Sequence, residues 1–437
     1  EDVRALLLAG LPPEASEPAH SDHWRWLLAY LVDWHRREMK AAWWEHYRIR
    51  DVASDELFDE PKALAGLQFV ETAEFVLNVR TKKPTGSVVD RYTFPPQENE
   101  LGRGKVTTRE VKFGDVVEHD RVRRVIDIRK GPAMADVHPS EIFADEIVSV
   151  DVLQDAVIAL AERVAADDED SCATELLLRN PPRLRKGQCA LKKGEAAGDA
   201  ALRVVGQLDR GVLAIQGPPG AGKTYVGAQM IRSLVRRGKR VGVTAVSHKV
   251  IENLLGAVLE QARASGETIS VGHKGKKDER VDDVTSEGAI QAFEKNGDAL
   301  DALASGQIQV LGATAWVWSS DAAAEAVDVL FVDEAGQMSL ANVLSVSAAT
   351  NSLVLLGDPQ QLEQPQKGSH PDGVDISALE HILGVAKTMP QDRGIFLPET
   401  WRLAPAICEF TSETFYEGKL RPRDDLAGQR LVGAGEF

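Results

Sequence analysis

Residues 213–224, LAIQGPPGAGKT, decide the fold, because an apolar run ends here in a glycine-rich turn with a lysine and a hydroxyl residue behind it. The turn GPPGAGKT fits the pattern GxxxxGK followed by Ser or Thr, and a helical stretch, KTYVGAQMIRSLV, follows it. In such a loop the backbone N–H groups and the helix N-terminus face phosphates, and the lysine lies at the β- and γ-phosphates. We therefore predict a triphosphate-binding loop made of Gly217, Pro218, Pro219, Gly220, Ala221, Gly222, Lys223 and Thr224, with Thr224 as a ligand of Mg²⁺.

Two further apolar runs end in polar residues that such a site needs. The run VDVLFVDEAGQ ends at Asp333 and Glu334. An aspartate in this place holds magnesium, and a second carboxylate beside it can take a proton from the attacking water. Acid pairs also occur on solvated loops, but these follow valines and leucines that we expect to be buried. The run LVLLGDPQQL at 353–362 places Gln361 where its amide can hydrogen-bond a γ-phosphate, although this pattern alone also fits an ordinary turn.

From residue 211 onward, strand-like apolar runs alternate with helical patterns. The runs are GVLAIQ, RVGVTAV, ISVG, IQVLGAT, VDVLFVDE and SLVLLGD. Short apolar runs alternating with helices predict an α/β fold with a doubly wound, mainly parallel sheet that helices cover on both faces. Ligands of such sheets bind at the carboxyl ends of the strands, where the three polar segments begin.

The first 200 residues are organised differently. Residues 1–65 predict a helical stalk, and residues 66–146 contain short β-rich runs that predict a small accessory β-barrel. Residues 147–199 predict a second stalk helix and a basic linker. An apolar stripe in the first stalk could stack on bases, but its helical spacing is more typical of core packing. The stripe consists of Trp24, Leu27, Leu28, Leu31 and Trp34.

The predicted barrel is the most basic folded stretch of an acidic chain. The net charge is -16, from 51 basic and 67 acidic residues, so any binding to nucleic acid must be local. Arg121, Arg123 and Arg124 give the barrel a face that can follow a phosphate backbone. The competing interpretation is that this charge run is ordinary solvated surface.

Composition narrows the class further. Of the 437 residues, 43% are hydrophobic, which is typical of a soluble globular protein. The sequence contains neither an apolar run long enough for a membrane span nor a secretory signal, so we expect a cytoplasmic protein. None of the three cysteines, Cys172, Cys189 and Cys408, lies in a CxxC pair, and we expect free thiols without a metal centre.

The order of the motifs resembles that of the superfamily-1 helicases, specifically the nonsense-mediated-decay (up-frameshift) helicase branch. The motifs are, in chain order, GPPGAGKT, TAVSHKVIENLL, GATAW, DEAG, GDPQQL and WRLAPAI. The segments DWHRREMKAAWWEHYRIRD, DRGIFLPETWRLAP and FYEGKL also look like the helicase half of bacterial proteins that fuse a RecB-family nuclease to this motor. The resemblance is strong over 211–420 and loose before it.

The resemblance implies a RecA-like ATPase domain over 200–392 that uses ATP and Mg²⁺. Lys223 and Glu334 are then catalytic, Gln361 senses the γ-phosphate, Arg402 reaches that phosphate from a second motor domain, and Trp401 stacks on the adenine. Contacts to single-stranded nucleic acid are implied for Thr244, Ser247, His248 and Thr314. The resemblance further implies 5′ to 3′ movement, and the nuclease of the fusion proteins favours DNA over RNA, in repair or in processing of foreign DNA.

Two departures from the family pattern qualify these expectations. The adenine-reading glutamine ahead of the loop has no good counterpart, because Gln207 has the wrong spacing, so other triphosphates fit as well. Residues 393–437 match only the start of a second RecA-like domain, so we interpret the chain as a fragment that follows a nuclease and hydrolyses ATP poorly by itself. The alternatives are an ATP-gated nucleic-acid clamp without unwinding activity and, less well supported by the motifs, a small-molecule kinase.

Overall fold

The computed structural model describes residues 2–78, 81–145, 147–275, 290–361 and 365–428. The chain divides into two compact units. One unit combines Glu1–Arg37 with Val150–Phe437, and the other is Glu38–Ser149.

The larger unit contains an eight-stranded sheet in the order β11-β10-β12-β9-β13-β14-β8-β15. Every neighbouring pair in it is parallel, as predicted. The strands are β8 (Val212–Gln216), β9 (Val241–Thr244), β10 (Val271–Lys274), β11 (Ile290–Phe293), β12 (Val310–Gly312), β13 (Val327–Val332), β14 (Thr350–Gly357) and β15 (Gly394–Phe396). Parallel strands of this kind are buried on both faces, which explains their nearly continuous apolar sequences.

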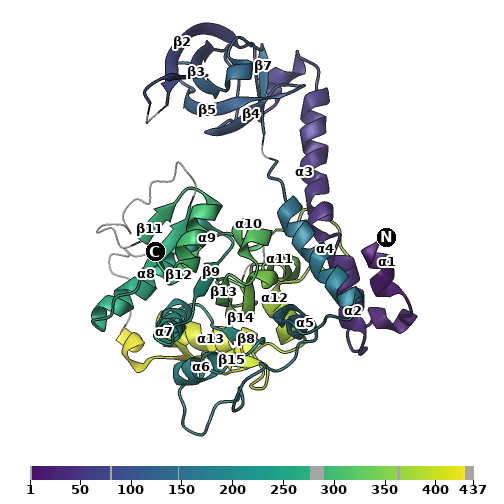
Figure 1. Ribbon diagram of the computed structural model, residues 1–437, viewed down its shortest axis with the longest axis vertical. Coiled ribbons are helices and arrows are strands. Elements are labelled where there is room, and N and C mark those ends of the chain that lie inside the picture. The colour runs from purple at the N-terminus through teal and green to yellow at the C-terminus, as the bar shows by residue number, and fades with distance from the viewer. Residues whose placement is uncertain (1, 79–80, 146, 276–289, 362–364, 429–437) are drawn as a thin grey trace, which may run out of the picture. The chain divides into compact units, whose positions relative to one another are not determined.

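Side chains of the strands enter two separate cores. Helices cover both faces of the sheet (Figure 1). In β8, Leu213 and Ile215 face one core, and Val212 and Ala214 face the other. The first core is covered by α6 (Ala197–Val205), α7 (Lys223–Val235) and α8 (His248–Ala264). The second is covered by α4 (Asp151–Ala165), α5 (Cys172–Leu177), α9 (Asn296–Ala304), α10 (Ala315–Trp318), α11 (Leu340–Ser345) and α12 (Ala378–Leu383). The predicted doubly wound α/β fold is therefore confirmed.

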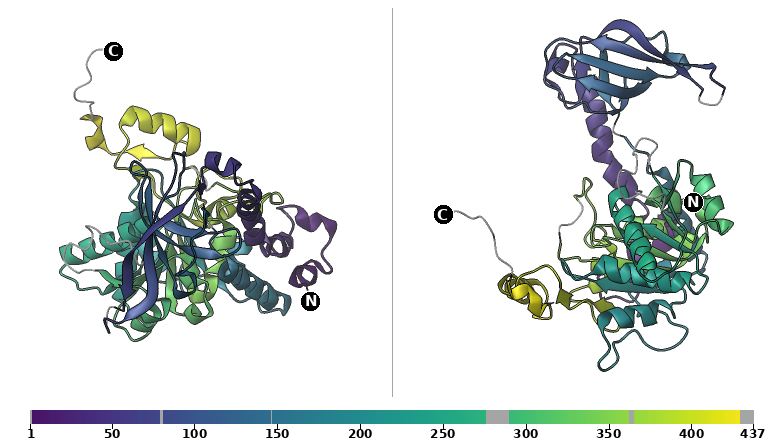
Figure 2. Two further views of the ribbon diagram at one scale, coloured as in Figure 1. Left: turned by 90° about the horizontal axis from the view of Figure 1, so that it is seen from above. Right: turned by 90° about the vertical axis from the view of Figure 1, so that its left-hand side faces the viewer.

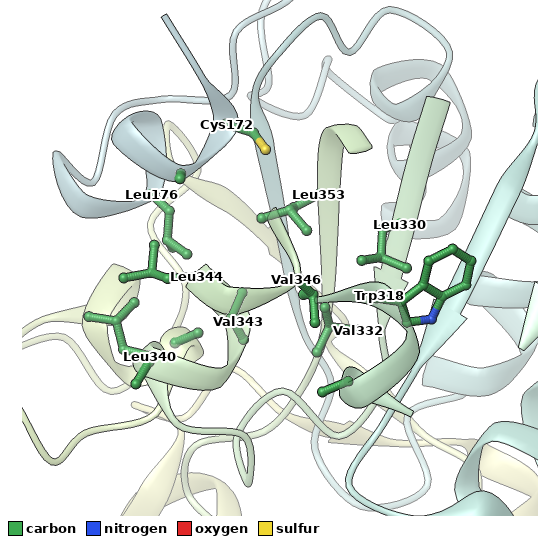
Figure 3. Packing of buried hydrophobic residues seen from close by; sticks show 14 of the residues in the cluster. Cys172, Leu176, Trp318, Leu330, Val332, Leu340, Val343, Leu344, Val346 and Leu353 are labelled. Carbon is green, nitrogen blue, oxygen red and sulfur yellow. The ribbon is translucent and has the colours of Figure 1, made fainter. Parts of the chain in front are cut away.

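The second core is centred on Trp318, whose ring is fully buried. Figure 3 shows it beside Leu330 of β13, with side chains of α11 and α5 continuing the apolar layer. Its indole N–H donates to the carbonyl oxygens of Ala313 at 3.0 Å and Val243 at 3.2 Å. A buried tryptophan needs such a partner, and here the partners lie on and just after sheet strands, so the bonds fix the ring against the sheet.

The N-terminal helices join this same core. They are α1 (Val3–Leu8), α2 (His23–Leu31) and α3 (Trp34–Asp51). The predicted apolar stripe from Trp24 to Trp34 is buried core, as expected, and it packs in one cluster with α4. The division into the two units falls at Arg37, within α3, because the residues before it bury their apolar side chains in the core of the larger unit.

The smaller unit contains a seven-stranded antiparallel sheet in the order β1-β7-β4-β5-β6-β3-β2, curled as Figure 2 shows. Six of its strands contribute to one core, while β2 is largely exposed. The first strand lies inside the segment that we expected to be stalk. The strands are β1 (Ala63–Ala65), β2 (Gln68–Leu77), β3 (Pro84–Thr93), β4 (Gly104–Thr107), β5 (Lys112–Asp120), β6 (Val125–Lys130) and β7 (Glu141–Ala144).

The C-terminal segment begins after β15. Strand β15 pairs with β8 and so belongs to the eight-stranded sheet. Beyond it, β16 (Glu399–Thr400) pairs with β17 (Arg421–Pro422) around α13 (Pro405–Phe415). Among the helices of the described chain, none combines the length and apolar character that crossing a bilayer requires.

Candidate active site

The loop after β8 has the backbone that close approach to phosphates requires. Gly220 and Gly222 have φ values of 76° and 81°, and Gly222 is the N-cap of α7. A Cβ atom on Gly217 would lie 2.4 Å from the Lys223 Cγ atom, and one on Gly220 would lie 2.5 Å from the Arg402 Cβ atom. Side chains at these positions are excluded by conformation or by space, so glycine lets the loop backbone pass close to a bound phosphate.

Lys223 is held across this loop. Its Nζ atom donates to the Gly217 carbonyl oxygen at 2.8 Å. Because Lys223 is the first residue of α7, its ammonium group lies at a helix N-terminus, whose backbone N–H groups also favour anions. Thr224 follows on the same turn and is half-buried.

The acidic pair follows β13. The Asp333 carboxyl is buried, and its Oδ1 atom accepts a hydrogen bond from the Glu334 backbone N–H at 2.9 Å. Burial, and secondly the charge of Glu334, raise the pKa of Asp333 to about 7, while the Lys223 ammonium acts in the opposite direction. Glu334 has a φ of 51°, a sparsely populated conformation that tends to occur at functional sites.

These side chains fit a magnesium ion. The Thr224 hydroxyl and the Asp333 carboxylate are oxygen donors, which Mg²⁺ prefers, and the ion usually completes its shell with waters and substrate phosphates. Within the described parts of the chain, no group of three or more His, Cys, Asp or Glu side chains is arranged to hold a metal. A carboxyl that burial makes costly to ionise is stabilised when a cation binds beside it.

Gln361 lies on the loop after β14, the strand that follows β13 in the chain and lies beside it in the sheet. Its Nε2 atom donates to the Oδ2 atom of Asp358 at 3.3 Å. Asp358 is buried, and Gln360 also donates its backbone N–H to it at 3.2 Å. The sequence indicated Gln361 as a sensor but gave no role to Asp358.

Residues 400–402 contact the phosphate-binding loop directly. The Thr400 hydroxyl donates to the Pro219 carbonyl oxygen at 3.0 Å, and the Trp401 backbone N–H donates to the Gly220 carbonyl oxygen at 2.9 Å. The same hydroxyl accepts from the backbone N–H of Arg402 at 3.3 Å. The sequence predicted roles for Trp401 and Arg402, whereas Thr400 was missed, because no local pattern reveals a contact across 181 residues.

The Trp401 side chain does not lie in a closed pocket. It is 60% exposed, and the Arg423 guanidinium lies 3.8 Å from its ring centroid. This cation–π contact orders the ring within the C-terminal segment.

The four residues expected to contact a nucleic-acid strand differ in accessibility. Thr244, at the end of β9, is fully buried, and within the described parts of the chain its hydroxyl has no hydrogen-bond partner, so its contact with a strand stays a prediction. Ser247 is exposed but caps α8 by accepting from the Val250 N–H at 3.3 Å. The Nδ1 atom of His248 lies 3.1 Å from the Nε2 atom of buried His273.

Burial and the neighbouring His248 lower the pKa of His273 to about 4, so this ring is neutral near neutral pH. Thr314 is half-buried at the start of α10.

The three arginines of the smaller unit lie in the turn between β5 and β6 and are exposed. Arg121 donates to the Leu101 carbonyl oxygen at 3.2 Å, and Arg123 lies 3.6 Å from the Asp120 carboxylate. Arg124 has a φ of 58°. The three side chains thus share one hairpin tip, and Asp120 is the carboxylate near them among the described residues.

The sheet, the glycine loop and the acidic pair together define a P-loop nucleoside-triphosphatase domain with a RecA-like fold. Residues 197–378 match the family model described as AAA domain, which begins at the first residue of α6.

Curated relatives of this domain are helicases. The DNA replication ATP-dependent helicase/nuclease DNA2 of Gallus gallus is 26% identical over 245 residues, which are 55% of this chain and 24% of that protein. The DNA polymerase alpha-associated DNA helicase A of Schizosaccharomyces pombe is 22% identical over 264 residues, 50% of this chain and 38% of that protein. The chain thus spans about a quarter to two fifths of these relatives and is similar to superfamily-1 helicases.

Among solved structures, the arterivirus nonstructural protein 10 (helicase) in complex with DNA matches 52% of this chain and 44% of its own, with 15% identity and a TM-score of 0.32.

Proposed function

We propose that this chain is the nucleotide-binding part of an ATP-dependent translocase or helicase that moves along single-stranded nucleic acid, with DNA as the substrate and 5′ to 3′ as the direction. Within the superfamily-1 helicases we assign it to the up-frameshift-like branch, joined in the whole protein to a RecB-type nuclease. The names of the DNA2 relatives, which combine helicase and nuclease, support this assignment.

One observation carries the proposal. The phosphate-binding loop, the sensor loop and the acidic pair follow β8, β14 and β13, which are consecutive in the sheet. The carboxyl ends of parallel strands lie at the same edge of a sheet. Lys223, Gln361 and Asp333 follow three neighbouring strands and therefore lie at that one edge of the sheet. The influence of the Lys223 charge on the pKa of Asp333 agrees with this proximity.

The residues divide the chemistry between them. The loop N–H groups and Lys223 bind and orient the phosphates, and Glu334, next to the metal-binding Asp333, takes the proton of the attacking water. Thr224 and Asp333 would hold Mg²⁺, which would neutralise negative charge on the phosphates. Burial of Asp333 limits water around this carboxyl, which strengthens its interaction with a cation.

The C-terminal segment connects the nucleotide to movement. Thr400 and Trp401 are bonded to the phosphate-binding loop, so a change in the loop is transmitted to β16 and α13. The Arg402 backbone lies close to Gly220, which brings this arginine next to the loop that binds the phosphates. The contact between residues 400–402 and the phosphate-binding loop closes and reopens during the ATP cycle. We propose that this change alters the affinity for the nucleic-acid strand.

A partial-duplex unwinding assay tests the proposal. Duplexes with either a 5′ or a 3′ overhang, made of DNA or RNA, are incubated with the protein and ATP. We expect opening of the 5′-overhang DNA substrate, and none with Lys223→Ala. If ATP changes the affinity for the strand but no substrate opens, the nucleotide-gated clamp replaces the helicase. Phosphorylation of a small molecule, with no response to strands, would overturn both.

A further inference from the structure

A buried carboxylate, Asp358, lies between the sensor loop and the C-terminal segment. It is 2% exposed and accepts four described hydrogen bonds. Its Oδ1 atom accepts from the Gln360 backbone N–H at 3.2 Å and from Gln216 Nε2 at 3.4 Å. Its Oδ2 atom accepts from Gln361 Nε2 at 3.3 Å and from the Tyr416 hydroxyl at 2.6 Å. A buried carboxylate requires such donors, because each unmade bond leaves a desolvated charge.

Tyr416 supplies the shortest of these bonds from a distant element. It is the C-cap of α13, lies 58 residues from Asp358 in the sequence, and is buried against Cys408 and Leu420. Burial, and secondly its bond to Asp358, raise the pKa of Tyr416. The hydroxyl therefore keeps its proton at physiological pH and acts as the donor.

The Oδ2 atom of Asp358 thus accepts hydrogen bonds from both the Tyr416 hydroxyl and the Gln361 amide. The hydroxyl bond, at 2.6 Å, is short and charge-assisted, whereas the amide bond, at 3.3 Å, is long. When the Gln361 amide turns toward a phosphate, the oxygen still has its stronger donor. Without the hydroxyl, the amide would be the one remaining donor to this oxygen among the described residues, and loss of the amide bond would leave a buried charge unsatisfied.

We propose that Tyr416 is a positioning residue for the γ-phosphate sensor: its hydroxyl satisfies Asp358, frees Gln361 to respond to a triphosphate, and ties that response to α13. This inference rests on the proposed function, because it takes Gln361 as the sensor. It adds a second link between the ATP site and the C-terminal segment, separate from the contacts of Thr400 and Trp401.

The test is the discrimination between triphosphate and diphosphate. The dissociation constants of ADP and of a non-hydrolysable ATP analogue, both with Mg²⁺, are measured by titration for the 437-residue chain and for Tyr416→Phe. The phenylalanine keeps the packing of the ring and removes the hydroxyl. We expect Tyr416→Phe to weaken binding of the triphosphate analogue about three- to tenfold, which is the size of a typical net hydrogen-bond contribution. The affinity for ADP should stay unchanged, since ADP offers nothing to Gln361.

Two controls separate positioning from general damage. Tyr47→Phe removes an exposed tyrosine hydroxyl in α3 and should leave both affinities unchanged. In a Gln361→Ala background, Tyr416→Phe should have no further effect on discrimination, because the residue acts through Gln361. Equal weakening of both nucleotides, or an effect that persists without Gln361, would reduce Tyr416 to a structural role.

The outcomes also separate this inference from the proposed function. The inference alone is overturned if the wild-type chain binds the triphosphate analogue and ADP with different affinities and Tyr416→Phe leaves that difference unchanged. A wild-type chain that binds neither nucleotide overturns both. If the variant does not fold, hydrogen exchange of the wild-type chain decides: we expect the amides of α13 to be protected more by the triphosphate analogue than by ADP, and equal protection would contradict the link.

Discussion

At the scale of single residues, Asp333 has the most unusual environment of the site. Its carboxyl is buried beside Glu334, and burial and the charge of Glu334 raise its pKa to about 7. The folded protein therefore keeps a proton on this group up to about pH 7, whereas the unfolded chain loses it near pH 4. Stability must fall as the pH rises through this window, because the unfolded state then binds fewer protons.

Asp333→Asn should remove this loss of stability. At pH 8 we expect the variant, without nucleotide or metal, to be more stable than the wild type by roughly 2 to 4 kcal/mol, and near pH 4 the difference should vanish. Urea unfolding of both proteins across this range measures the difference. A difference that does not grow between pH 4 and pH 7 would show that Asp333 ionises normally.

Lys223 and Glu334 should separate binding from turnover. Lys223→Ala removes the ammonium group that is bonded across the loop, and nucleotide binding should be lost. Glu334→Gln keeps the size and removes the base, so binding should persist while hydrolysis stops. Titration with a fluorescent triphosphate and a phosphate-release assay measure the two properties. Equal loss of binding in both variants would mean that Glu334 is not the base.

At the scale of elements, the segment that contains Thr400 and Trp401 is hydrogen-bonded to the phosphate-binding loop. Thr400→Val removes the hydroxyl donor to Pro219 and should weaken triphosphate binding about three- to tenfold. Thr400→Ser should restore it. The matched control is Thr411→Val in α13, which removes a hydroxyl that donates to the Ile407 carbonyl oxygen of its own helix. An unchanged triphosphate affinity in Thr400→Val would show that the hydrogen bond from Thr400 to Pro219 has no role in nucleotide binding.

The turn between β5 and β6 is the element that we expect to hold the strand. Replacing Arg121, Arg123 and Arg124 by glutamine should lower the slope of log affinity for single-stranded DNA against log salt by about two, because each phosphate contact contributes about 0.7. Lys186, Lys192 and Lys193 are exposed residues of another segment, and their neutralisation matches the charge change. An unchanged slope in the arginine variant, or the same change in the arginine and lysine variants, would show that the turn does not bind the strand.

The elements that could be predicted from the sequence are those whose pattern of residues lies within one short segment. The long apolar runs of β8, β13 and β14 and the glycine loop identify both the sheet and the active edge, since burial on both faces requires such runs. The short strands were harder. The strand β15 was assigned to a second domain, and β11 was not predicted, because three or four residues carry little periodicity and their partners are distant.

The same limit applies to the site. Lys223, Asp333 and Gln361 follow strands and could be placed on one edge from sequence. Thr400 and Tyr416 act through contacts with residues 181 and 58 positions away, which no local pattern reveals. Thr244 was expected at the strand-binding surface, yet the end of β9 is covered on both faces of the sheet, so its side chain is buried.

At the scale of the whole molecule, the chain has two compact units with different chemistry. The larger combines the N-terminal helices with the ATPase sheet, and the smaller carries the arginine turn on an antiparallel sheet. With a net charge of -16, the protein relies on such local basic features for any contact with nucleic acid. A motor requires that strand binding and ATP turnover depend on each other.

The most direct test of this dependence is the rate of ATP hydrolysis by the chain with and without single-stranded DNA. We predict a low rate with Mg²⁺ and ATP alone, a rate several times higher with an unstructured DNA strand, and no hydrolysis by Glu334→Gln under either condition. A rate that the strand leaves unchanged, in a protein that binds both ATP and DNA, would contradict the coupling on which the account depends.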